Sequence, residues 1–108
     1  MKKTVTLNIG QEIEMLGLPV PTVKGEDGKP RPMTVGDLML RRIPGAASRD
    51  DDHATRLWNI GFEMDKAEAT FTMTEVDSEL LRKAICKGEI ETWARIALIR
   101  VFKEAKRE

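Results

Sequence analysis

Two copies of one four-residue pattern divide this chain. Thr34-Val-Gly-Asp37 and Thr74-Glu-Val-Asp77 each follow a methionine and precede an apolar run. In each copy, the threonine hydroxyl can accept from an N–H group of a first helical turn, and the aspartate can accept from the backbone of the threonine. The carboxylate also lies where the helix dipole favours negative charge. The pattern therefore predicts helices that begin at residues 35 and 75.

Apolar residues at helical spacing predict four helices in all. The first helix should end at Pro44-Gly45, and Gly88 should end the third. A polar linker over residues 45–52 supplies aspartates that can cap the second helix. The predicted helices span 35–43, 53–66, 75–87 and 90 to near the C terminus.

Two segments have the alternating pattern of a half-buried strand. Residues 4–9 and 69–73 alternate polar with apolar side chains, and we expect them to pair because a lone short strand is not stable. The Gly/Pro-rich residues 19–32 are expected to form a mobile loop, with a reverse turn or loose hairpin at residues 25–28. The predicted fold is a single α+β domain, 1–108, in which a small two-stranded sheet packs against three or four helices and the last two helices form a C-terminal hairpin.

The chain is neutral overall, but its charge is unevenly distributed. Eighteen basic and eighteen acidic residues cancel, whereas residues 1–49 carry a net charge of +3, residues 50–79 of −7 and residues 80–108 of +4. Such variation is typical of solvated helix faces, and it also permits contact with a charged partner or a second copy. The sequence has no apolar run of membrane-spanning length, and we expect a cytoplasmic protein.

The residue types that usually perform chemistry do not form a recognisable site. The one histidine, His53, follows Asp50-Asp51-Asp52, which is more typical of a helix N-terminus than of a metal site. The single cysteine, Cys86, lies in an apolar helical stretch and is interpreted as a small core residue. We therefore predict no enzyme activity, no metal, no cofactor and no small-molecule substrate.

The last predicted helix carries more apolar surface than one core needs. One stripe contains Trp93, Leu98 and Val101, but Ile96 and Ile99 lie on the far side of the helix, with Phe102 nearby. These residues suggest a second buried contact, supplied by a protein partner, a second copy or the N-terminal segment of the same chain. Basic side chains would rim this contact, and the acidic Asp50–Asp52 would complement them. The candidate partner-binding residues are Arg95, Ile96, Ile99, Arg100, Phe102 and Lys103.

A DNA-binding regulator is one alternative, because the last two predicted helices form a helix–turn–helix-like pair. The N-terminal part of the last helix, residues 89–93, is acidic and apolar, and its positive charge comes late. A recognition helix normally presents polar and basic side chains at its N-terminal part, so this distribution of charge argues against nucleic-acid binding. A modulator of a host protein is the other alternative.

Three segments resemble short hypothetical proteins encoded by tailed bacteriophages and prophages. They are Met33-Thr-Val-Gly-Asp-Leu-Met-Leu, Thr55-Arg-Leu-Trp-Asn-Ile, and residues 71–85 with the closing helix. The resemblance covers roughly residues 33–105. It implies a prophage context and a role in virion or tail assembly, in a bacterial cytoplasm or on the virion, and it implies no catalytic residues. The predicted function is that of a non-catalytic accessory protein that acts through protein–protein contacts.

Overall fold

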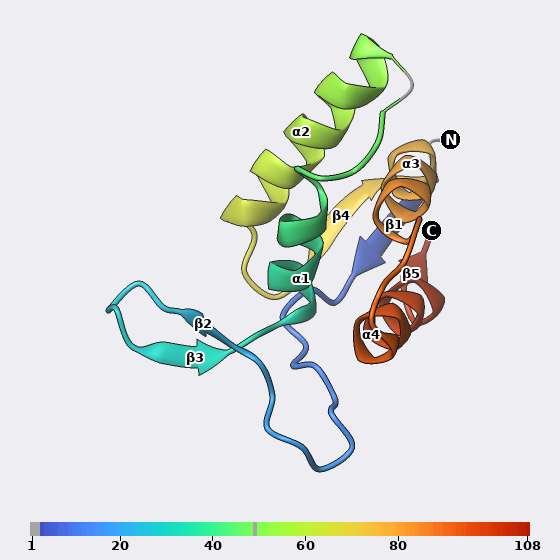
Figure 1. Ribbon diagram of the computed structural model, residues 1–108. Coiled ribbons are helices and arrows are strands. Elements are labelled where there is room, and N and C mark those ends of the chain that lie inside the picture. The colour runs from blue at the N-terminus through green and yellow to red at the C-terminus, as the bar shows by residue number, and fades with distance from the viewer. Residues whose placement is uncertain (1–2, 49) are drawn as a thin grey trace.

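The computed structural model describes residues 3–48 and 50–108, so residue 49 of the predicted linker lies outside the described residues. The described part has an α+β fold with four helices and two small antiparallel sheets (Figure 1). The elements in chain order are β1 (Thr4–Leu7), β2 (Thr22–Lys24), β3 (Pro30–Pro32), α1 (Val35–Arg42), α2 (Asp51–Lys66), β4 (Phe71–Thr74), α3 (Glu75–Ile85), α4 (Thr92–Lys103) and β5 (Lys106–Arg107).

The larger sheet has the strand order β4-β1-β5, with β1 at its centre. The predicted pairing of the two alternating segments is confirmed, because Val5 pairs with Met73 in the antiparallel ladder of β1 and β4. The prediction of two strands is wrong. The last helix ends at Lys103, and the two basic residues of β5 then pair with Val5 and Thr6. No alternating pattern marks so short a strand, which is why the sequence did not reveal it.

One face of this sheet forms part of the core. Val5, Leu7 and Met73 point into it and are buried with apolar residues from all four helices, among them Leu81 of α3. The opposite face is polar, as alternation requires. There the hydroxyls of Thr6 and Thr72 lie 2.8 Å apart on neighbouring strands.

The first capping box forms completely. Thr34 donates its backbone N–H to the Asp37 carboxylate over 2.9 Å, and Asp37 donates its own N–H to the Thr34 hydroxyl over 3.3 Å. Arg31 also donates twice to this carboxylate, over 2.7 and 2.9 Å. The Arg31 guanidinium is the main cause of a lowered pKa at Asp37; the Thr34 bonds lower it further, and partial burial opposes them.

The second box forms only in part. Asp77 donates its N–H to the Thr74 hydroxyl over 3.1 Å, so the predicted cap of α3 is present. The Asp77 carboxylate, however, bonds to Arg56 of α2 and thereby joins two helices. Since Arg56 lies 21 residues away in the sequence, only the tertiary fold brings the two groups together.

α2 begins two residues earlier than predicted, at Asp51, because Asp50 caps it by accepting from the His53 N–H over 2.8 Å. It is 16 residues long. Within the ranges that the structure describes, no helix is long and apolar enough to cross a membrane.

The predicted loop over residues 19–32 contains a regular hairpin of β2 and β3, which projects away from the helices (Figure 1). The predicted turn is confirmed, because Gly28 donates to the carbonyl of Gly25 over 2.9 Å. The prolines of this segment do not prevent the strand pairing. Gly25 bonds to Lys29 and Met33 to Pro21, so in this register Pro30 and Pro32 fall at positions that do not donate within the pair. These prolines also leave the outer edge of β3 poor in donors.

The lowered pKa of Asp37 predicts a specific pH dependence. Asp37→Asn should destabilise the protein by about 1 kcal/mol at pH 7, because the ionised carboxylate makes the bonds to Arg31 and Thr34. The contribution of a carboxylate whose pKa falls on folding is lost as pH drops. The difference between wild type and variant in urea denaturation should therefore shrink below about pH 4. The exposed Glu68→Gln is the control, and an equal pH profile for both variants would contradict this role of Asp37.

Candidate interaction surfaces

α4 has one face that belongs wholly to the core. Ala94, Leu98 and Val101 are buried on it, as the predicted apolar stripe requires. Phe102 is buried as well, with 4% of its surface exposed, and therefore does not lie on the predicted contact surface. The reason is helical spacing, because Phe102 follows Leu98 by four residues and shares its face.

The opposite face of α4 is exposed and partly apolar. Ile96 is 43% exposed and Ile99 46% exposed, so the prediction that both lie outside the core is confirmed. Arg100 and Lys103 are exposed beside them. The four residues follow the spacing i, i+3, i+4 and i+7, which places them on one stripe. We call this stripe the outer face of α4; its binding of a partner stays a prediction.

Two of the predicted binding arginines already have partners within the chain. Arg100 donates to the Glu14 carboxylate over 2.5 Å, in an ion pair that is exposed to solvent. Arg95 points instead to the turn after α3, where it donates to the carbonyls of Cys86, over 3.4 Å, and Gly88, over 2.8 Å. Arg95 therefore supports the fold and does not belong to the outer face of α4.

Arg42 of α1 approaches the same turn from the other side. It donates to the carbonyls of Ile85, over 2.5 Å, and Lys87, over 3.1 Å. The last carbonyls of a helix lack partners within it, and positive charge is favourable there. Arg42 and Arg95 together hold four carbonyls at the end of α3 and so fix α3 relative to α1 and α4.

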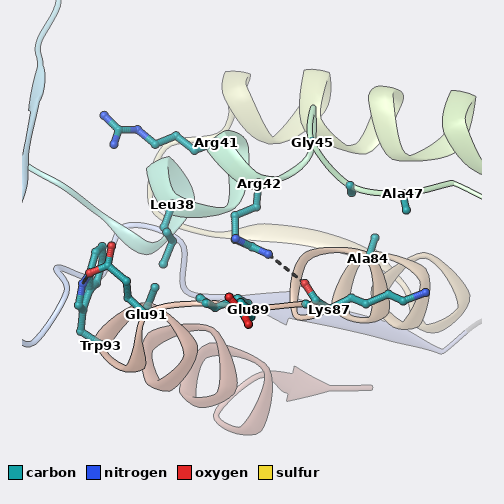
Figure 2. A pocket seen from close by; sticks show the side chains of 14 residues that line it. Leu38, Arg41, Arg42, Gly45, Ala47, Ala84, Lys87, Glu89, Glu91 and Trp93 are labelled. Atoms are coloured by element: carbon teal, nitrogen blue, oxygen red, sulfur yellow. Dashed lines mark hydrogen bonds between the residues drawn. The ribbon is translucent and has the colours of Figure 1, made fainter.

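A hollow of about 600 Å³ opens beside this turn (Figure 2). Figure 2 shows Arg42 reaching toward the Lys87 carbonyl, whereas Arg41 points away from it. Glu91 also lines the hollow, and its carboxylate accepts from the Trp93 indole over 2.8 Å. Arg42 and Glu91 are both bonded within the chain, so the hollow lies beside a turn that these bonds hold.

Cys86 lies at the end of α3 and is half-buried. Burial raises the pKa of its thiol, while the charges of Arg82, Arg95 and Arg42 act to lower it. A thiol with a raised pKa stays protonated at neutral pH and is a weak nucleophile. This environment fits the interpretation of Cys86 as a packing residue.

The acidic run before α2 has a structural role. Asp50 is the N-cap, and Asp51 and Asp52 lie in the first turn, where the helix dipole favours them. In the described part of the chain, no three side chains of His, Cys, Asp or Glu are grouped so that they could hold a metal ion.

A second exposed apolar surface lies on α2, and the sequence analysis did not predict it. Trp58 is 61% exposed and Phe62 60% exposed, one helical turn apart. With Leu40, Ile43 and Pro44 they line a hollow of about 340 Å³, and we call these five residues the aromatic face. The sequence does contain a sign of this surface. Trp58, Phe62 and Asp65 follow helical spacing and form a stripe next to the buried stripe of the same helix.

The aromatic face is shaped by a buried glycine. Gly61 lies between Trp58 and Phe62, and a side chain there would meet the Ile43 methyl Cδ1 at 3.2 Å. The missing side chain lets Ile43, at the end of α1, approach the backbone of α2 closely. Asp65 lines its edge, and the Lys66 ammonium lies 4.5 Å from the centre of the Phe62 ring.

Comparisons with known proteins identified no relative. No protein-family model matches the chain, and no curated protein and no solved structure shows significant similarity to it.

The role of Arg95 and Arg42 in holding the α3–α4 turn can be tested by denaturation. Arg95→Ala and Arg42→Ala should each lower the free energy of unfolding by about 1–3 kcal/mol, because backbone carbonyls lose their donors. Arg95→Lys should not restore it, since an ammonium cannot reproduce the forked geometry of a guanidinium. Lys103→Ala is the matched basic control on α4 and should change stability by less than about 0.5 kcal/mol. A stability of Arg95→Ala equal to that of the control would contradict this assignment.

Proposed function

We propose that this protein is a non-catalytic accessory protein of a phage or prophage and acts through protein–protein contacts in virion or tail assembly. It would work in the cytoplasm of the bacterial host or as part of the virion. The outer face of α4, with Ile96, Ile99, Arg100 and Lys103, is the proposed contact surface. The phage context rests on the resemblance of residues 33–105 to short phage proteins.

The observation that carries the proposal is the exposure of Ile96 and Ile99 on a helix whose inner face is firmly held. Two β-branched side chains one turn apart lose little conformational freedom when a partner covers them. Because Leu98 and Phe102 anchor the helix in the core, its outer face is already rigid before binding. Arg100 and Lys103 can form a charged rim around an apolar centre, which is the usual anatomy of a protein interface.

The basic residues of α4 are not arranged as in a recognition helix for DNA. A DNA-binding helix needs free basic side chains for phosphates and base edges. Arg95 donates to two backbone carbonyls, which leaves Arg100 and Lys103 in the last turn of the helix as its outward basic side chains. A recognition helix presents its basic side chains at its N-terminal part instead, so protein binding is the function that the arrangement favours.

Photo-cross-linking in cells that carry the encoding phage tests this function. The full chain, with a photoreactive amino acid in place of Ile99, should form adducts with one or a few proteins. Their masses should identify virion components or further copies of this chain. The same substitution at Lys83, which is exposed on α3, serves as the control and should give no such adducts. Adding Ile96→Asp should lower the yield of the Ile99 adducts about tenfold or more, because it places a charge in the contact.

Three results would overturn the proposal. The first is the absence of protein adducts from position 99 in a chain whose circular dichroism shows it to be folded. The second is the same adduct pattern from positions 83 and 99. The third is cross-linking to DNA from position 99, which would support a regulator.

A further inference from the structure

We infer that the partner is a second copy of this chain, and that the outer face of α4 in one molecule docks on the aromatic face of the next. This inference rests on the proposed function and names its partner. It joins two exposed apolar surfaces that the fold leaves uncovered, Ile96 and Ile99 on α4 and Trp58 and Phe62 beside α1.

The two surfaces are complementary in shape and polarity. On the outer face of α4, Ile96, Ile99 and Lys103 follow the spacing i, i+3 and i+7. Helices that bind in apolar grooves contact them with side chains at this spacing. The aromatic face supplies such a groove, with a hollow of about 340 Å³ between the end of α1 and α2. Gly61 also lines it, and its missing side chain leaves the room that Ile43 occupies.

Charge selects this pairing over the symmetric ones. α2 carries four acidic and two basic side chains, one of which is Lys66 beside the Phe62 ring, whereas α4 carries three basic side chains and no acidic one. If two aromatic faces docked on each other, two acidic regions would meet. If two outer faces of α4 docked on each other, two basic regions would meet. Like charges across an interface are unfavourable, so a contact of unlike surfaces is preferred.

Individual residues at the rims fit the same arrangement. Asp65 lines the hollow on α2, and with Glu68 it also borders the open groove that adjoins the hollow. Lys103 is exposed on α4. The ion pair of Arg100 with Glu14 is exposed on both sides, so it contributes little and can be exchanged for a carboxylate of the neighbour.

The positions of the two surfaces determine what kind of assembly results. Both α2 and α4 pack on α1, and Figure 1 shows them on opposite sides of the molecule. A contact between unlike surfaces leaves one free surface at each end of a pair. It therefore continues into a ring or a filament rather than stopping at a dimer.

A complementation experiment tests this inference. The first variant, Ile96→Asp/Ile99→Asp, loses the outer face of α4 and keeps the aromatic face. The second variant, Trp58→Ala/Phe62→Ala, does the reverse. In sedimentation velocity, wild type should form species larger than dimers as its concentration rises, and each variant alone should remain monomeric. An equimolar mixture should form a one-to-one dimer and nothing larger, because each variant retains one functional surface.

The matched control is Val76→Asp, which places the same charge at an exposed apolar residue of α3 outside both surfaces. It should assemble like wild type. Higher salt should weaken wild-type assembly, since the contact joins opposite charges. If a double variant fails to fold, Ile99→Ala and Trp58→Ala replace the pairs, and each should weaken association about tenfold or more.

Each other outcome contradicts the inference in its own way. Dimers of the α4 variant alone would mean that aromatic faces pair, and dimers of the second variant alone would mean that α4 faces pair. A wild type that stays monomeric while position 99 still cross-links to a different protein overturns this inference and leaves the proposed function standing. The absence of both self-association and cross-linking overturns both.

Discussion

The pairing of β1 with β4 and β5 is the constraint on which the rest of the structure depends. It joins residues near the start of the chain to residues 71–74 and to Lys106–Arg107 near its end. Thr74 pairs with Thr4 and also caps α3, so the position of that helix follows from the ladder. Since the sheet offers one apolar face, the helices must supply their buried stripes to a single core, in which Leu81 and Leu98 are fully buried.

A core built on one apolar sheet face buries only part of the apolar surface of these helices. Each helix buries one stripe, and the apolar residues beside or opposite that stripe remain in water. On α3 this leaves Val76 alone, which is ordinary for a soluble domain. On α2 and α4 it leaves pairs of large side chains at helical spacing, and these two helices differ in charge. The proposed contacts use these exposed pairs, because a partner can bury paired apolar residues on rigid helices at low entropic cost.

Local signals in the sequence predicted most of the helices and the main strand pair, because caps and apolar periods act over a few residues. The features that were missed depend on distant partners. The two residues of β5 form a strand only because β1 offers an edge. Arg95 was predicted to bind a partner, because the carbonyls that it contacts lie in the turn after α3 and are brought to it by the tertiary fold. The burial of Phe102 and the aromatic face could have been predicted from the sequence. Helical spacing alone places Phe102 on the same face as Leu98, and Trp58 on the same face as Phe62.

Nuclear magnetic resonance of the wild-type protein over a concentration series tests the central claim most directly, because each backbone amide reports on its own surroundings. We predict that dilution changes the amide shifts of two separate regions together, residues 58–65 on α2 and residues 96–103 on α4. The amide of Val76 should not respond. Shifts that change at only one of these regions would mean that like surfaces pair, and shifts that do not change with concentration would mean that the molecules do not associate. Either result would contradict the account.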